Sequence, residues 1–418
     1  MSDENQIVAI KSIQKKLLGK KLSYREIYML MDEIAHKRLS DVLTTYFVAS
    51  SFKEGYSADE LYYFTKAMVE TGNQLHFKGI VADKHSTGGV SGTRTTMIIV
   101  PIIASAGIKI PKVSSRAITS PSGTADTMEV LARVDFSPKE ITKIVNQVGG
   151  CIAWNGNLNI APADDIIIRV EEPLSFESFD KIIISVMAKK VAVGATHLIL
   201  DIPVGKTMKI RHFYDADKVR EKFKQLAHRF KIKVIFDVSE TLEPAGRGVG
   251  PALEARDVLY ILEQKKERPL KLEAKALRLA GKLLDICFTD MNIKKSGEDE
   301  ARRILTEGSA LKKFREMVKA QQGNDQISSE TLKIKSHTLE IRAAHFGKIK
   351  EINNYNLNAL AKILGAPTDK FAGLYLFKKI DEFVEKKEPL VKLYSTDKYR
   401  LKEAEVSFKN FPVYEIES

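Results

Sequence analysis

The chain has 418 residues, of which 44% are hydrophobic and 29% charged, proportions typical of a globular protein with two or three domains. Its 66 basic and 54 acidic side chains give a formal net charge of +12. No basic tail or arginine-rich arm is present, so this excess favours a small anionic substrate over a nucleic acid. The longest apolar run, Met97 to Gly107, is too short to cross a membrane.

The two cysteines, Cys151 and Cys287, lie far apart and outside any metal-binding or redox spacing. We expect both to be buried apolar side chains in a reducing compartment. The first six residues, MSDENQ, lack the basic start and apolar core of a signal peptide. The sequence therefore predicts a cytoplasmic protein, and no pattern in it indicates a metal ion or an organic cofactor.

Residues 6–72 are predicted to be helical. Ser23 with Glu26, and again Ser57 with Glu60, have the spacing of a capping box, and apolar residues at helical intervals follow each pair. No strand pattern appears in this block. It predicts an α-helical unit at the start of the chain.

After this block, strands, polar loops and helices alternate. We expect strands at 109–113, 150–154, 196–203 (a central strand) and 233–236, and helices at 97–106, 127–131, 138–148, 181–193, 216–230, 251–262, 271–284 and 298–321. Such alternation is typical of α/β domains, which bind ligands at the carboxyl ends of their strands. Past residue 328, expected strands at 331–341, 372–377 and 391–395 with a helix at 357–364 predict a compact β-rich lobe.

Two polar loops in the α/β region have the composition of an oxyanion site. Residues 84–96 and 114–126 combine glycines, hydroxyl side chains and cations, and a predicted helix follows each loop. Glycines let backbone N–H groups approach a ligand, and charge-assisted hydrogen bonds are the strong ones. The loops together predict a clamp for one tetrahedral anion, formed by Lys84, Ser86, Thr96, Ser114 and Thr124. The alternative is that each is a polar surface loop.

Other candidate residues have a functional and a structural interpretation. His85, kept neutral by Lys84, is a proton carrier, a donor to a sugar oxygen, or a structurally bonded loop residue. Asp164 and Asp165 form an acid pair with one raised pKa, or cap a turn. The set Arg169, Ser185 and Lys189 offers donors to a polar heterocycle, or forms a surface of ion pairs. Residues 246–250 (GRGVG) have the composition of another anion loop, but a lone pattern of this kind is a weak signal, so we favour a helix cap.

The motif at residues 84–90, KHSTGGV, resembles the thymidine/pyrimidine-nucleoside phosphorylase family, and the resemblance covers nearly the whole chain. Residues 115–130, 149–154 and 161–169 are similar to the archaeal AMP phosphorylase branch. The resemblance implies a small helical domain (residues 1–75, completed by about 165–195) and a larger α/β domain (76–164 and 196–327), with a cleft between them. It also implies a C-terminal, β-rich, barrel-sandwich-like lobe (328–418).

The same resemblance implies phosphorolysis, in which inorganic phosphate is a co-substrate and AMP gives adenine and ribose 1,5-bisphosphate. The first alternative is a uridine or thymidine phosphorylase, and the second is a non-catalytic nucleotide-binding protein on the same scaffold. Archaeal relatives usually carry an additional N-terminal domain, which this chain lacks. We therefore expect a homodimer rather than a larger assembly, with no nucleic-acid or membrane partner.

The resemblance also assigns residues to the site. It matches the five clamp residues to phosphate ligands, and it places His85 beside the ribose. The proton donor to the leaving base is Asp164 or Glu177, where this chain has glutamate in place of the usual aspartate. The nucleotide- and base-contacting positions are Gly89, Ser115, Arg116, Ala117, Ile118, Thr119, Ser120, Thr124, Arg169, Ser185, Lys189 and Lys209.

Overall fold

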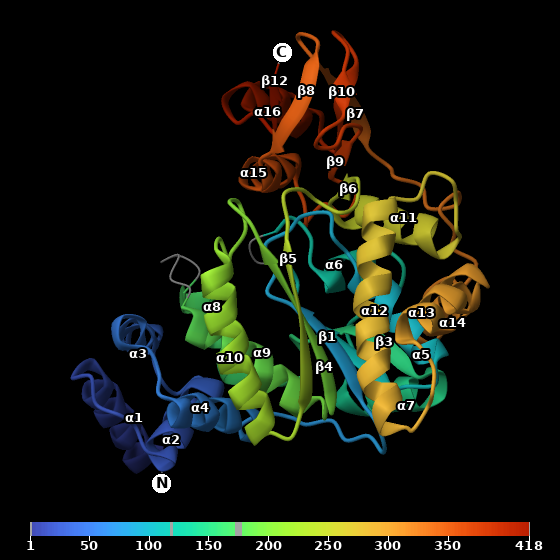
Figure 1. The fold of residues 1–418 in the computed structure, drawn as a ribbon. Helices are drawn as coiled ribbons and strands as arrows, with labels where there is room; N and C mark the ends of the chain where they lie inside the picture. Colours follow the sequence, from blue (N-terminus) through green and yellow to red (C-terminus); the bar gives the residue numbers. More distant parts are fainter. Residues whose placement is uncertain (1, 118–119, 172–177, 418) are drawn as a thin grey trace.

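The computed structural model describes residues 2–117, 120–171 and 178–417. Figure 1 shows helices at the N-terminal end, a sheet flanked by helices in the middle, and a lobe with several strands at the C-terminal end. The predicted fold class, a helical domain followed by an α/β domain and a β-rich lobe, is confirmed. None of the helices within these ranges combines the length and the apolar character that crossing a bilayer requires.

The helical unit combines N-terminal helices with two that come later in the chain. It contains α1 (Ser2–Leu17), α2 (Tyr24–Ala35), α3 (Asp41–Glu54), α4 (Ala58–Glu70), α8 (Pro162–Glu171) and α9 (Phe179–Ala192). Both predicted capping boxes are present, at Ser23 and Ser57, and such caps stabilise a helix by about 1 kcal/mol. Helix α8 packs against α2 and α3, and α9 packs against α4. The later helices are thereby built into the N-terminal bundle.

A parallel sheet forms the centre of the α/β domain. Its strands are β1 (Ala82–Ser86), β2 (Ile110–Ser114), β3 (Gly150–Trp154), β4 (His197–Val204) and β5 (Lys233–Glu240). Strands pair in the orders β1-β4-β5 and β2-β3, and a parallel bridge from Val81 to Lys109 connects the two groups. Every pairing is parallel, so the carboxyl ends of all five strands meet at one edge.

The expected central strand is confirmed, because β4 lies between β1 and β5 and is buried along its whole length. Strand β1 is absent from the sequence-based expectations. The polar side chains of Lys84, His85 and Ser86 do not show the apolar pattern of a strand, so the sequence favours a loop at these positions. In the structure these residues pair in register with residues 199–201 of β4.

Helices cover both faces of the sheet, with α9 and α10 on one side and α5 and α12 on the other (Figure 1). The helices of this domain are α5 (Thr96–Ser105), α6 (Thr124–Glu129), α7 (Pro138–Val148), α10 (Phe213–Arg229), α11 (Pro251–Leu262), α12 (Leu270–Asp290), α13 (Gly297–Thr306) and α14 (Ser309–Ala320). The single helix expected at 298–321 is wrong. Gly308 adopts a left-handed conformation with φ of 80° and separates α13 from α14.

The C-terminal lobe has an apolar core of its own. Its elements are β7 (His337–Arg342), β8 (Gly347–Ile352), α15 (Asn354–Leu364), β9 (Gly373–Leu376), β10 (Phe383–Val384), β11 (Pro389–Ser395), α16 (Lys398–Asn410) and β12 (Tyr414–Glu417). A short strand of the α/β domain, β6 (Gly248–Val249), pairs with β9 and extends the order to β6-β9-β11-β7. This pairing joins the lobe to the domain that carries the polar loops.

Candidate active site

A cavity of about 600 Å³ lies where the helical unit faces the carboxyl ends of β1 and β2. Aromatic side chains of the helical unit, including Phe47, Tyr56 and Phe64, line one side of it. The polar loops that follow β1 and β2 line the other side. The sequence predicted a cleft between these two domains, and the cavity lies there.

The first polar loop supplies three of the predicted phosphate ligands. Lys84 and Ser86 lie at the end of β1, Thr96 is the first residue of α5, and all three line the cavity. Between them, Gly88 and Gly89 adopt left-handed conformations with φ of 84° and 88°. Residues with a Cβ rarely adopt these angles, so glycine is required for the chain to turn here.

The second polar loop supplies the remaining two predicted phosphate ligands. Ser114 ends β2, Thr124 begins α6, and both line the same cavity. Residues next to β1 and β2 are joined by the bridge from Val81 to Lys109, so the ends of the two strands lie side by side. All five residues of the predicted clamp therefore surround one space, although they come from two separate loops of the sequence.

Burial and neighbouring charges set the protonation of the first loop. Burial lowers the pKa of Lys84 to about 8, although Asp201 Oδ2 lies 3.8 Å from its Nζ and favours the charged form. Burial, together with the charges of Lys190, Lys112 and Lys84, holds the pKa of His85 well below its ordinary value. His85 is therefore a neutral imidazole at neutral pH, as the sequence predicted.

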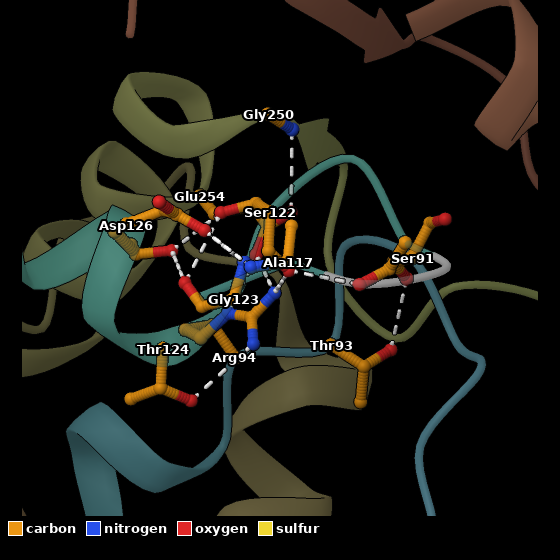
Figure 2. A network of polar contacts seen from close by, with 12 residues as sticks. Ser91, Thr93, Arg94, Ala117, Ser122, Gly123, Thr124, Asp126, Gly250 and Glu254 are labelled. Carbon is orange, nitrogen blue, oxygen red and sulfur yellow. Dashed lines mark hydrogen bonds and ion pairs between the residues drawn. The ribbon is translucent and has the colours of Figure 1, made fainter. Parts of the chain in front are cut away.

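Arg94, which is not among the predicted clamp residues, connects the two polar loops (Figure 2). Its Nη2 donates to the Ser122 carbonyl at 2.6 Å, and its Nη1 donates to Thr124 Oγ1 at 3.3 Å. Its Nε donates to Glu254 of α11 at 2.7 Å. The sequence showed Arg94 as a cation inside a glycine-rich loop. The residues that it contacts are set by the fold.

A buried ionic cluster, also absent from the prediction, lies beneath the clamp. Lys190 Nζ is 2.6 Å from Asp83, while Lys112 Nζ is 3.3 Å from Asp83 and donates to the Lys84 carbonyl at 2.8 Å. Burial alone would raise the pKa of Asp83, but the two lysines outweigh it and lower this pKa. Burial lowers the pKa of Lys190 to about 7, so the second positive charge of this cluster, below the place where an anion would bind, is only partly present at neutral pH.

Three polar residues converge at the end of the cavity lined by the helical unit. Ser185 Oγ donates to Asp164 Oδ2 at 2.8 Å, and Lys189 Nζ lies 2.6 Å from the same oxygen. All three line the cavity, so the structure brings Asp164 together with Ser185 and Lys189 as the sequence suggested. Asp165 does not line it; Asn155 Nδ2 donates to its carboxylate at 3.0 Å, and burial raises the pKa of Asp165 to about 6.

Arg169 does not line the cavity with these residues. On α8, Asp164, Ile167, Ile168 and Glu171 face the cavity, as helical spacing requires of positions three, four and seven residues apart. Arg169 comes five residues after Asp164 and points away, and its Nη2 lies 2.7 Å from Asp41 in an exposed ion pair. The structure therefore does not bring Arg169 together with Ser185 and Lys189, and its contact with the base stays a prediction.

The nucleotide-contacting positions divide into three groups. Gly89, Ser115, Arg116, Ser120 and Lys209 line the cavity. Ala117 does not; its N–H donates to Asp126 at 2.7 Å. Ile118, Thr119 and Glu177 lie outside the described residues.

The guanidinium of Arg116 is already neutralised. Its Nη1 lies 3.1 Å from Asp126 and 2.6 Å from Glu129, and the group stacks over the ring of Trp154. These contacts raise the pKa of Arg116 further above its ordinary value. Arg116 therefore shapes the second loop more than it offers a free charge to a ligand.

Comparisons with known proteins agree with this arrangement. Residues 10–72 match the helical bundle domain of the glycosyl transferase family, residues 78–311 match the a/b domain of that family, and residues 348–415 match the pyrimidine nucleoside phosphorylase C-terminal domain. Anthranilate phosphoribosyltransferase from Thermus thermophilus superposes with a TM-score of 0.61 over 75% of this chain and 99% of that one. At 17% identity, that likeness concerns the fold alone.

Relatives in sequence cover nearly the whole chain. AMP phosphorylase 1 of Archaeoglobus fulgidus is 43% identical over 95% of this chain and 78% of its own length. AMP phosphorylase of Thermofilum pendens is 42% identical over 95% of this chain and 76% of its own length. A putative thymidine phosphorylase of Bradyrhizobium diazoefficiens is also 42% identical, over 93% of this chain and 75% of its own length.

Proposed function

Because this chain belongs to the glycosyl transferase family and is a pentosyltransferase of the phosphorylase type, we propose that it cleaves AMP with inorganic phosphate. The products are adenine and ribose 1,5-bisphosphate. The observation that carries the proposal is the convergence of Lys84, Ser86, Thr96, Ser114 and Thr124 on one cavity. A lysine and several hydroxyl groups are suitable donors for a phosphate dianion.

The reaction then follows from positioning and charge. An oxygen of the bound phosphate forms a bond to C1′ of the ribose while the bond from C1′ to N9 of adenine breaks. The electron pair of that bond moves to the base, which takes up a proton from a carboxyl group, either Glu177 or Asp164. Phosphate is a weak nucleophile, so the main contributions are its orientation and the stabilisation of the oxocarbenium-like carbon. The similarity to relatives named AMP phosphorylase supports this substrate.

Asp164 fits the role of a positioning residue better than that of the acid. It accepts from Ser185 at 2.8 Å and lies 2.6 Å from Lys189 Nζ. Although burial opposes it, the charges of Asp164 and Asp165 raise the pKa of Lys189, so this lysine stays a charged donor held in place by Asp164. We therefore assign Asp164 to the orientation of Lys189 and Ser185 toward the base, and Glu177 to proton donation.

A pyrimidine nucleoside is the second candidate substrate, because a relative of nearly equal identity is named a putative thymidine phosphorylase. One assay separates the candidates. The purified protein is incubated with phosphate and, separately, AMP, CMP, UMP, adenosine, uridine or thymidine, and free base is measured by chromatography. We expect phosphate-dependent release of adenine from AMP. Release from uridine or thymidine but from no nucleotide would contradict the proposal, and no release from any substrate would indicate a binding protein.

We also propose that the protein is a homodimer with no cofactor besides its co-substrate phosphate. Exposed apolar side chains on and next to α1 and α3, among them Leu17, Leu18 and Val42, support a protein–protein contact at the helical unit. Light scattering should give a mass of two chains. A mass of one chain, or of a large assembly, would contradict the dimer.

A further inference from the structure

One face of α15, a helix of the C-terminal lobe, lies on the first polar loop. Asn354, Asn358 and Lys362 are spaced four residues apart and so share this face. Asn354 Nδ2 donates to the Gly89 carbonyl at 2.5 Å, and the Ser91 N–H donates to Asn354 Oδ1 at 3.1 Å. Ser91 Oγ donates to Asn358 Oδ1. The lobe thus holds the loop by hydrogen bonds to its backbone and to a hydroxyl.

The same face continues into the cavity. Lys362, one turn beyond Asn358, is a cavity-lining residue and the lobe's contribution to that lining among the residues described. Lys209 reaches the same loop from the α/β domain, because a Cβ built on Gly89 would lie 3.1 Å from Lys209 Cγ. Asn354 Nδ2 also donates to the Thr207 carbonyl at 3.4 Å. Helix α15, the segment at 207–209 and the loop therefore meet at one side of the cavity.

Most other cations of the cavity already have an acidic partner. The pairs are Lys84 and Lys275 with Asp201, Arg94 with Glu254, Lys112 with Asp83, Arg116 with Glu129, Lys181 with Glu171, and Lys189 with Asp164. Within the described part of the chain, the ammonium group of Lys362 has neither an ion pair nor a hydrogen bond. Lys362 therefore brings an uncompensated charge to the cavity.

A nucleoside 5′-monophosphate would bring a second phosphate into this site. The attacking phosphate occupies the clamp, and two phosphate groups repel each other unless each has its own cation. A nucleoside brings no such second charge. A cation next to the clamp but outside it therefore favours nucleotides over nucleosides.

We propose that α15 completes the nucleotide site: Asn354 and Asn358 fix residues 89–91 of the loop, and Lys362 supplies positive charge to the 5′-phosphate. The C-terminal lobe then sets the preference for nucleotides. This inference rests on the proposed function, since it concerns the 5′-phosphate of the same substrate.

The test compares Lys362→Gln with Lys402→Gln, which removes an exposed lysine of α16 that does not line the cavity. Initial rates give KM for AMP and, in the same reaction, KM for inorganic phosphate. We expect Lys362→Gln to raise KM for AMP about tenfold, the usual scale of one charged hydrogen bond, with KM for phosphate changed less than about twofold. Lys402→Gln should change neither constant, and Lys362→Arg should restore most of the affinity for AMP.

Salt provides a second readout. KM for AMP should rise with ionic strength in the wild type and less steeply in Lys362→Gln. An unchanged KM for AMP in Lys362→Gln, or equal increases in both Michaelis constants, would overturn the inference alone. A wild-type protein that cleaves nucleosides and no nucleotide would instead overturn the proposed function, and this inference with it.

Discussion

One carboxylate oxygen of Glu254 contacts two nitrogens of Arg94, at 2.7 Å from Nε and 2.6 Å from Nη2. The glutamate side chain is only 1% exposed and the arginine 12%. Glu254 lies on α11, whereas the remaining N–H groups of Arg94 reach the second polar loop (Figure 2). Helix α11 thereby orients the residue that connects the two halves of the predicted phosphate clamp.

Arg94→Ala should weaken phosphate binding. Ser122 and Thr124 lose a charged donor that is worth on the order of 1.5–3 kcal/mol, so KM for phosphate should rise about tenfold to a hundredfold. The melting temperature should also fall, because the buried Glu254 loses its cationic partner and keeps only the hydrogen bond from the Gly250 N–H, and burial already raises its pKa.

Glu254→Gln is the matched variant. It should shift KM for phosphate in the same direction by less, and the double variant should show less than the sum of the two effects. Additive effects would show that the pair does not act as a unit. Enzyme kinetics and thermal unfolding on the four proteins provide the measurement.

Phosphate affinity should decrease at alkaline pH. The pKa of Lys84 lies near 8, so its ammonium group is charged below that pH and progressively neutral above it. Inorganic phosphate stays dianionic over this range, and the lost charge is therefore that of the protein. KM for the phosphate dianion should change little below about pH 7.5 and rise by about fivefold between about pH 8 and 9, approaching tenfold per pH unit beyond.

Lys84→Ala should abolish turnover, because it removes the lysine of the first loop that we assign to phosphate. Wild-type rates in this variant would refute the assignment of Lys84 to phosphate. A phosphate KM that stays constant from about pH 7.5 to 9.5 would contradict the lowered pKa instead.

The two candidate acids can be separated by pH–rate profiles. If Asp164 positions Lys189 and Ser185, Asp164→Asn should raise KM for the nucleotide about tenfold and leave the shape of the kcat profile unchanged. Glu177→Gln should remove the alkaline limb of the kcat profile, in which activity falls because the catalytic acid loses its proton. Loss of that limb in Asp164→Asn, with retention in Glu177→Gln, would make Asp164 the proton donor.

The raised pKa of Asp165 should make the stability of the folded protein depend on pH. Its pKa is about 6 in the folded state and near the ordinary 3.8 when unfolded, so between these values unfolding releases a proton. Stability therefore decreases as pH rises through this window, and the cost, on the order of 3 kcal/mol, persists above about pH 6. Asp165→Asn cannot ionise, so its melting temperature should exceed that of the wild type at about pH 7.5 and approach it at about pH 5.

The exposed Asp217→Asn variant is a suitable control for general charge effects. It should leave the melting temperature unchanged at both pH values. A lower melting temperature of Asp165→Asn than of the wild type at the higher pH would show that the carboxylate is stabilising there.

Local patterns in the sequence predicted most of the elements correctly. Capping boxes at Ser23 and Ser57 begin helices because they involve residues three apart, which any chain segment can arrange alone. The two polar loops were identified by composition, and parallel strands bring their ends together at one edge. The left-handed break at Gly308 was missed, since glycine is also tolerated within helices at a cost of about 1 kcal/mol.

The sequence by itself identified five candidate clamp residues that line one cavity, since glycines, hydroxyls and a lysine in two short loops have the chemistry of an oxyanion site. Only the tertiary structure decided which charges are free to act. Arg169 points away because helical geometry places it opposite Asp164, and Arg116 is neutralised by Glu129. Arg94, Asp83 and the helix that carries Lys362 gained their positions from partners more than a hundred residues away in sequence. Such contacts depend on how domains pack, and no local pattern records them.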